Sequence, residues 1–242
     1  MLVPIENQVV LVVGASSGIG RATAALFART GARVMASARR SERLLELKES
    51  LAHEGRTLET LAADAADASQ MEHLVRHTRA HLGEIDVLVF ATGTNVPDRS
   101  MTRLTTEIWD MVVSVNLNAA YYVTRAALPA MRERGAGHLI YISSVSGLFA
   151  DISGAAYQAS KRGLLGLAHA IRVEEKENGI RTCVICPGLV HTELLDRRPV
   201  KPSAETLAKA LLPEDVAETV LAVARLPRRV CVPEMQVVPA YL

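Results

Sequence analysis

The sequence predicts an α/β fold in which a doubly wound parallel sheet carries helices on both faces. Short β-branched runs alternate with longer helix-like segments along most of the 242 residues. Several of the short runs are almost wholly apolar, as strands buried on both faces must be. The length suits one large domain, and the composition does not divide the chain into unlike halves. We therefore expect one domain over residues 1–242. A glycine follows five of the helix-like segments, where helices commonly stop: Gly31, Gly55, Gly83, Gly135 and Gly179.

These patterns predict where the strands and the helices lie. The β-branched and apolar runs predict strands at 9–13, 33–37, 57–62, 85–90, 137–143, 181–185 and 235–238. Helices are expected between them at 20–30, 41–54, 69–81, 105–134, 155–178 and 214–226, with a break within the long fourth one. Residues 189–212 are the least regular stretch and are expected to form a substrate lid.

Composition and charge exclude several classes of partner. The formal net charge is +1 and the sequence pI is about 7.8, so no overall field attracts a phosphate backbone or anionic lipid. No apolar run reaches the roughly 18 residues of a membrane span, and no basic residues precede an apolar segment at the start. We therefore expect a cytoplasmic protein with a small-molecule substrate, and neither nucleic acid nor membrane as partner.

The cysteines and histidines do not predict a redox or metal site. Cys183 and Cys186 form a C-x-x-C pattern within an expected strand, where residues three apart point to opposite faces of the sheet. We interpret them as buried structural cysteines. His73, His77 and His81 recur every four residues on an expected helix, which we interpret as a solvated face, so no metal site is expected.

The first expected strand runs into a glycine loop and then a helix. Glycines there allow backbone N–H groups to approach a pyrophosphate at the helix N-terminus, which predicts dinucleotide binding on a Rossmann-type sheet. The spacing Gly-x-x-x-Gly-x-Gly resembles that of the short-chain dehydrogenase/reductase family, although Val13 stands where the family usually has threonine. The loop reads Gly14, Ala15, Ser16, Ser17, Gly18, Ile19 and Gly20.

The residues after the second strand favour NADP over NAD as the cofactor. Enzymes that prefer NAD have a carboxylate there, whereas this chain has Ala38 followed by Arg39 and Arg40, whose guanidinium groups suit a 2′-phosphate. For Arg40 alone, a solvated helix entrance is an acceptable interpretation. The family resemblance implies that Asp64, with Ala65 beside it, contacts the adenine edge.

A tyrosine and a lysine four residues apart are the candidate catalytic pair. Tyr157 and Lys161 would share one face of a helix, and the nearby cation is expected to lower the pKa of the phenol toward working pH. The pair alone is a common coincidence on helices. Tyr157, however, lies 13 residues after Ser144, at the end of an expected strand, where open α/β sheets bind ligands.

The family resemblance implies a role for each of these residues. Tyr157 would be the general acid in reduction and the base in oxidation, and Lys161 would also bind the nicotinamide ribose. Ser144 would hydrogen-bond the substrate oxygen, while Asn116 would hold a water that links Lys161 to solvent. Ser143 is the less suitable serine, because its side chain should point to the other side of the strand.

This chain departs from the family pattern after the fourth strand but keeps the segment that contacts the nicotinamide. Where the family commonly has Asn-Asn-Ala-Gly after the fourth strand, this chain has Phe90, Ala91, Thr92 and Gly93. Ala91 and Gly93 would still let the backbone approach the cofactor, and Thr94 and Asn95 would partly replace the missing amides. The segment that embraces the nicotinamide in the family is matched by Pro187, Gly188, Val190 and Thr192.

The substrate pocket is expected to be mainly apolar and to suit a ketone or aldehyde of modest size. Asn178 stands where carrier-protein reductases of the family often have arginine, which weakens a carrier-bound 3-oxoacyl substrate, although Arg132 and Arg134 remain possible anion contacts. The expected wall consists of Leu148, Ile152, Leu189, Leu194 and Leu195.

Together these features predict an NADP(H)-dependent oxidoreductase that interconverts a carbonyl and the corresponding alcohol, with Tyr157 as general acid/base. The alternative is a catalytically idle NADP-sensing or regulatory protein on the same fold, which would have no chemical need for the full set of catalytic residues. A nucleotide-sugar epimerase or dehydratase would usually have a longer C-terminal region. The resemblance implies a homotetramer or dimer that pairs the helices at 105–134 and 155–178.

Overall fold

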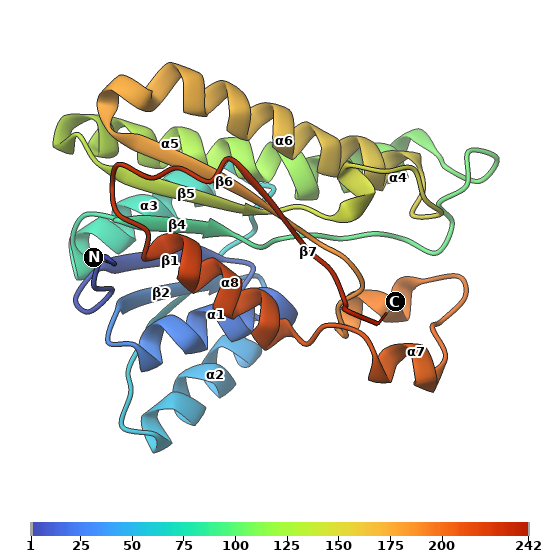
Figure 1. Cartoon of the computed structure of the whole chain (residues 1–242), viewed down its shortest axis with the longest axis horizontal. Coiled ribbons are helices and arrows are strands. Elements are labelled where there is room, and N and C mark those ends of the chain that lie inside the picture. The colour runs from blue at the N-terminus through green and yellow to red at the C-terminus, as the bar shows by residue number, and fades with distance from the viewer. Residues whose placement is uncertain (1, 242) are drawn as a thin grey trace.

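The computed structural model describes residues 2–241, in which seven parallel strands form one sheet (Figure 1). Their order across the sheet is β3-β2-β1-β4-β5-β6-β7, so the chain winds outward in both directions from β1 and β4. The point between β1 and β4 is where such sheets bind ligands, and the predicted fold class is confirmed. The strands are β1 Val9–Val13, β2 Arg33–Ala38, β3 Glu59–Ala62, β4 Val87–Phe90, β5 Gly137–Ile142, β6 Ile180–Pro187 and β7 Glu234–Val237.

Helices cover both faces of the sheet, as Figure 1 shows with α1, α2 and α8 on one side and α3, α5 and α6 on the other. None of the helices within residues 2–241 is both long and apolar enough to cross a membrane. The helices are α1 Gly18–Arg29, α2 Ser41–His53, α3 Ala68–Leu82, α4 Thr106–Val113, α5 Ala119–Arg134, α6 Ala155–Glu175, α7 Ala204–Ala208 and α8 Pro213–Ala224.

Alternation along the strands divides the core into two layers. In β1, Val10 and Val12 pack on the face of α1 and α8, whereas Val9, Leu11 and Val13 pack on the face of α3 and α5. The two cysteines of β6 follow the same rule. Cys183 lies in the first layer and Cys186 in the second, both buried, and burial raises their pKa values to about 12 and about 11. The prediction that they point to opposite faces is confirmed.

The break expected within residues 105–134 is a π-helical turn. Helix α4 ends at Val113, the turn occupies Ser114–Asn118, and α5 begins at Ala119. A π turn holds one extra residue and often lies at a functional site. This turn carries Asn116, one of the residues expected to be catalytic.

The predicted lid contains more structure than its sequence indicates. Val190 pairs with Leu211 in an isolated bridge, and the His191 N–H donates to the Leu211 carbonyl at 2.8 Å. These contacts join the two ends of the segment. Between them lie a 3-10 helical turn at Glu193–Arg197 and the short helix α7, neither of which was predicted. Movement of this segment stays a prediction.

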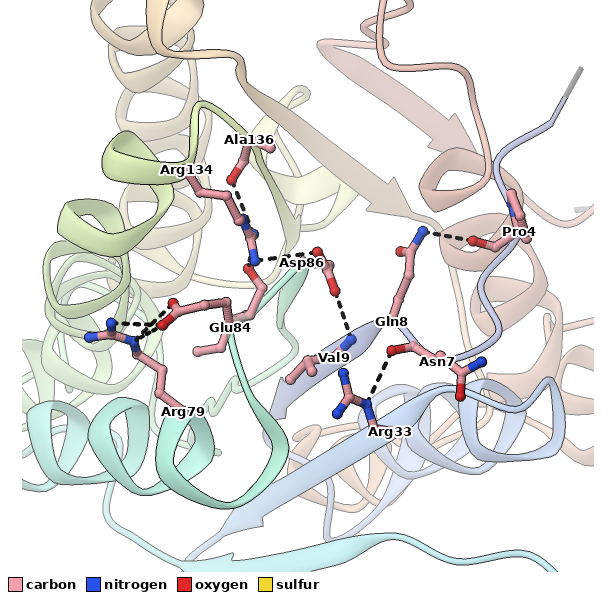
Figure 2. A network of polar contacts seen from close by, with 11 residues as sticks. Pro4, Asn7, Gln8, Val9, Arg33, Arg79, Glu84, Asp86, Arg134 and Ala136 are labelled. Atoms are coloured by element: carbon pink, nitrogen blue, oxygen red, sulfur yellow. Dashed lines mark hydrogen bonds and ion pairs between the residues drawn. The ribbon is translucent and has the colours of Figure 1, made fainter.

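A polar network joins the amino ends of the central strands, at the edge of the sheet opposite to the glycine loop (Figure 2). The Val9 N–H donates to the Asp86 carboxylate at 2.9 Å, and Arg134 lies 3.4 Å from the other oxygen of that carboxylate. Arg134 also donates to the carbonyls of Ile85 and Ala136 at 2.7 and 3.1 Å. The network therefore fixes where β1, β4 and β5 begin.

This arrangement corrects one expectation from the sequence. Arg134 is engaged at the amino ends of the strands, and Arg132 pairs there with the buried carboxylate of Glu175. Ligands bind at the other edge of such a sheet. The interpretation of these two arginines as contacts for an anionic substrate is therefore wrong.

Candidate active site

A cleft of about 1320 Å³ runs across the carboxyl ends of the strands, from the glycine loop after β1 to the start of α6. Gly20 is buried against Gly14 and Ala91, which line the cleft, while Pro187, Gly188 and Val190 line a smaller pocket beside it. The fold thus brings the residues of several distant motifs to one edge of the sheet. The predicted cofactor residues that line the cleft are Gly14, Ser16, Ser17, Gly18, Ile19, Arg39, Arg40, Asp64, Ala65, Ala91, Gly93, Tyr157, Lys161 and Thr192.

The glycine loop leaves no room for side chains where the chain turns into α1. Gly14 has a φ of +99°, and a Cβ there would lie 2.7 Å from the Thr92 nitrogen. A Cβ on Gly20 would lie 2.2 Å from the Gly14 carbonyl oxygen. The N-cap Ser17 makes no side-chain cap, and the first turn of α1 holds no acidic residue. The N–H groups of that turn are therefore available to an anion such as a pyrophosphate.

The two arginines after β2 make different contacts. Arg40 donates to the hydroxyls of Ser16 and Ser17 at 3.0 and 2.7 Å, and it pairs at 3.0 Å with Glu193 from the opposite wall. Arg39 reaches only to within 4.0 Å of Asp64. Arg40 thus contacts the phosphate loop, although it is also the exposed N-cap residue of α2, as the alternative interpretation expected. Both guanidinium groups line the cleft, and this donor set fits a dinucleotide with a 2′-phosphate.

Tyr157 and Lys161 lie in the first turns of α6, and both are buried. The Lys161 Nζ donates to the Ile142 carbonyl at 2.9 Å and lies 5.8 Å from the centre of the Tyr157 ring. Burial lowers the pKa of Lys161 to about 8. Burial also raises the pKa of Tyr157, against a smaller lowering by the Ser144 hydroxyl. The expected net lowering of the Tyr157 pKa is therefore wrong for this structure, because loss of solvent outweighs the favourable contacts.

The two serines at the end of β5 have different partners. Ser143 donates its hydroxyl to the Lys161 carbonyl at 2.8 Å, which places it against the backbone of α6. The Ser144 hydroxyl accepts from the Ser146 N–H at 3.1 Å and lies by the phenol of Tyr157. Ser144 is therefore the serine better placed to share a ligand oxygen with Tyr157.

Asn116 lies behind the cleft rather than on its surface, and its side chain is fully buried. It bonds to the backbone of Thr94 and donates to the Ser160 hydroxyl at 3.0 Å. It makes no direct bond to Lys161. A Cβ on Gly93 would lie 3.2 Å from the Lys161 Nζ and 4.0 Å from the Asn116 carbonyl oxygen, so these groups converge. The backbone of Thr94 thus anchors the unusual segment after β4, and its hydroxyl also accepts a hydrogen bond from Arg197 at 2.9 Å.

The smaller pocket, of about 600 Å³, opens beside Tyr157 and Ser144. Leu189, Leu194 and Leu195 line it as predicted, whereas Leu148 and Ile152 do not. The expectation of a mainly apolar wall is wrong, because two guanidinium groups that the sequence analysis did not single out, Arg99 and Arg198, also line it. They come from separate loops whose sequences carry no periodic pattern. Their position depends on the tertiary fold.

Comparison with known protein families shows to which family this chain belongs. A family model described as short chain dehydrogenase matches residues 8–202. The chain belongs to the short-chain dehydrogenase family. This short-chain dehydrogenase places the glycine loop, Ser144, Tyr157 and Lys161 at the carboxyl edge of the sheet. Within residues 2–241, no group of three His, Cys, Asp or Glu side chains is arranged to hold a metal ion.

Individual relatives of this short-chain dehydrogenase differ in length and in the activity for which they are named. A 3-oxoacyl-[acyl-carrier-protein] reductase of Thermotoga maritima is 33% identical over 223 residues, which are 90% of each chain. A glycine betaine reductase of Emericella nidulans is 34% identical over 241 residues, but these cover 98% of this chain and only 19% of that protein. A solved serine dehydrogenase in complex with NADP+ superposes with a TM-score of 0.87 at 32% identity, over 95% and 94% of the two chains.

Proposed function

We propose that this short-chain dehydrogenase uses NADP(H) to interconvert a carbonyl compound and its alcohol, with Tyr157 as general acid and base. One observation carries the proposal. Tyr157 lines both the long cleft and the smaller pocket, so its phenol lies where a dinucleotide and a substrate would meet. A proton donor is useful for this chemistry only at such a junction.

The preference for NADP rests on charge at the end of β2. Arg39 and Arg40 stand where an enzyme specific for NAD has a carboxylate, and Arg40 is held against the phosphate loop by Ser16 and Ser17. The NADP+ complex of the serine dehydrogenase relative supports the same cofactor. Bound NADPH would supply a hydride to the carbonyl carbon.

Proton transfer is the task of this chain's own residues. In reduction, the O–H of Tyr157 would give its proton to the carbonyl oxygen as the C–H bond forms, and in oxidation the phenolate would take the proton back. The raised pKa keeps Tyr157 protonated at neutral pH, which suits the acid role. Ser144 would donate a hydrogen bond to the same oxygen. Lys161 would bind the ribose and stabilise the phenolate left after proton transfer.

The remaining predicted residues would act by positioning. Asn116 would act on Gly93 and Lys161 through the backbone of Thr94, and the water that was expected beside it stays a prediction. Pro187, Gly188, Val190 and Thr192 would hold the nicotinamide, since they line the pocket next to Tyr157. The list of site residues as a whole stays a prediction until variants are measured.

The test is loss of NADPH absorbance with a panel of aldehydes, ketones, 3-oxoesters and quinones, run in parallel with NADH. We expect turnover that prefers NADPH and falls roughly 10²- to 10⁴-fold in Tyr157→Phe, while NADPH binding is retained. Tight NADPH binding without turnover on any compound would favour the alternative of an idle NADP-sensing protein. A Tyr157→Phe variant as active as the parent would remove Tyr157 from the mechanism.

We also propose that the chain assembles as a homotetramer or dimer through α4, α5 and α6, and that it works in the cytoplasm. Trp109, Tyr121 and Val173 support the assembly, because they expose 38%, 48% and 58% of their surface on these three helices. Light scattering of the purified protein tests it, and a monomer at micromolar concentration would exclude it.

A further inference from the structure

We propose that the substrate carries a carboxylate, which Arg99 and Arg198 bind while Tyr157 and Ser144 receive its carbonyl or alcohol oxygen. The inference rests on the proposed function and makes it more specific. It assigns the substrate to the short oxo acids and hydroxy acids rather than to neutral ketones or aldehydes. Both arginines line the pocket that contains Tyr157 and Ser144.

Arg99 is a buried guanidinium with donors to spare. Only 9% of the residue is exposed, yet it follows β4 in a loop. Its Nε donates to the Val96 carbonyl at 2.9 Å, and its Nη2 donates to the Arg197 carbonyl at 2.6 Å. A guanidinium has five N–H donors, and Nη1 makes no hydrogen bond within the described residues. The remaining donors are therefore available to a ligand in the pocket.

The pocket also lacks a counterion for these charges. Neither Arg99 nor Arg198 takes part in any ion pair among residues 2–241. Asp151 is near enough to raise the pKa of Arg99, but it pairs with neither arginine and does not line the pocket. Burial and the neighbouring Arg198 both lower the pKa of Arg99. Two cations that share a pocket without an acid are stabilised by an anionic ligand.

The fold places the loop of Arg99 next to the turn of α6 that carries Tyr157. Gly154 has a φ of +89°, and a Cβ there would lie 2.6 Å from the Arg99 carbonyl oxygen. Because Gly154 is the N-cap of α6, the loop of Arg99 packs directly under the turn that carries Tyr157. Arg99, Arg198 and Tyr157 line the same pocket, and the loop of Arg99 packs on the N-cap of α6, three residues before Tyr157. A substrate that bridges the guanidinium groups and the phenol therefore lies within this pocket.

The rest of the pocket fits the carbon chain of such a substrate. Leu189, Leu194 and Leu195 provide an apolar wall between the polar groups. The pocket is smaller than the cleft, and part of it is lined by Pro187, Gly188, Val190 and Thr192, so the space left beside a bound nicotinamide suits only a small compound. Arg198 belongs to the lid segment, which Arg99 already contacts through the Arg197 carbonyl, so a bound carboxylate would add a second link between the lid segment and the Arg99 loop.

Two matched pairs of compounds test the proposal. Calorimetry on the NADPH-bound protein compares butyrate with butyramide, which have the same size and lack a reducible ketone. Turnover compares a four-carbon aldehyde acid, succinic semialdehyde, with its methyl ester. We expect butyrate alone to bind, and kcat/KM to favour the acid at least tenfold. Arg99→Met and Arg198→Met should each lower kcat/KM for the acid about 10- to 100-fold, with less than threefold change for the ester.

Arg103→Met is the matched control, since Arg103 lies in the same loop but pairs with Asp98 at the surface. It should leave both substrates unaffected. If Arg99→Met fails to fold, Arg198→Met decides, because Arg198 is half-buried in the lid. Equal loss for acid and ester in both variants would show a structural role and overturn the proposal.

The outcomes also separate this inference from the proposed function. Equal kcat/KM for acid and ester in the parent would exclude the carboxylate site and leave the carbonyl chemistry standing. If neither compound turned over while butyrate bound and the arginine variants abolished that binding, the carboxylate site would stand and the carbonyl chemistry would be in question. Butyrate and butyramide binding equally well would exclude the anion site whatever the turnover.

Discussion

Asn116 bonds to both backbone groups of Thr94: its side-chain carbonyl accepts the Thr94 N–H at 2.7 Å, and its amide donates to the Thr94 carbonyl at 3.0 Å. This two-point contact fixes the chain just after β4, where the cleft passes Gly93. It also makes the π-helical turn and the segment after β4 a single unit.

Replacing Asn116 should therefore lower the stability of the protein as well as its catalytic rate. Asn116→Ala leaves the buried N–H and carbonyl of Thr94 without partners, and we expect a loss of roughly 2–4 kcal/mol in the free energy of unfolding. Urea denaturation measures this loss. Asn118→Ala, on the same turn but half-buried, is the control and should cost less than about 1 kcal/mol. Equal losses in the two variants would contradict the role of the contact.

The pKa of Lys161 predicts a specific pH dependence of stability. Its folded value of about 8 lies below its usual value, so the unfolded state binds more protons between those two values. Burial of the charge thus costs stability below pH 8, and that cost disappears as the pH rises above 8. The stability of Lys161→Met relative to the parent should fall by roughly 2–3 kcal/mol from pH 7 to pH 10. Parallel stability curves for the two proteins would show that Lys161 does not titrate in this range.

The network at the amino ends of the strands should affect stability without affecting catalysis. Asp86→Ala removes the acceptor of the Val9 N–H and the partner of Arg134, and we expect a loss of about 1–3 kcal/mol with kcat unchanged. Glu84→Ala removes only an exposed pair with Arg79 and should cost less than about 1 kcal/mol. Thermal unfolding together with steady-state kinetics measures both. A large drop in kcat for Asp86→Ala would mean that the two edges of the sheet are coupled.

Glu193 should weaken the binding of NADPH relative to NADH. Its carboxylate pairs with Arg40 at 3.0 Å, and a 2′-phosphate would compete for that guanidinium. Glu193→Gln keeps a hydrogen-bond acceptor but removes the charge. Because an exposed ion pair contributes at most about 1 kcal/mol, the preference for NADPH should rise by about three- to fivefold. Glu46→Gln, which pairs with Arg43 on α2, is the control, and fluorescence titration with each cofactor gives the ratio. An unchanged ratio would place the phosphate elsewhere.

The sequence predicted those parts of the fold and site that depend on local pattern. All seven strands were found within two residues or so of their ends, because apolar β-branched runs mark strands buried on both faces. The glycine loop, Ser144, Tyr157 and Lys161 carry short motifs, and the fold brings them together at one edge. The helix α7 was missed, since it has only five residues and little apolar periodicity.

Other features of the site depend on contacts between distant segments. Arg99 and Arg198 lie in different loops about a hundred residues apart, and no spacing rule connects them. The pairing of Glu193 with Arg40 joins the lid to the phosphate loop across more than 150 residues. The pKa of Tyr157 was predicted with the wrong sign, because burial depends on how the loops close over α6.

The π-helical turn at Ser114–Asn118 has a consequence for how this chain tolerates changes in length. Such a turn differs from an α-helical one by a single inserted residue. Deleting one residue there would restore a continuous α-helix without shifting the apolar face of α5 against the sheet, yet Asn116 would rotate away from Thr94. In this region a one-residue deletion would thus keep the packing of α5 and lose the contact between Asn116 and Thr94, so the extra residue of the turn serves the segment after β4 rather than the helix.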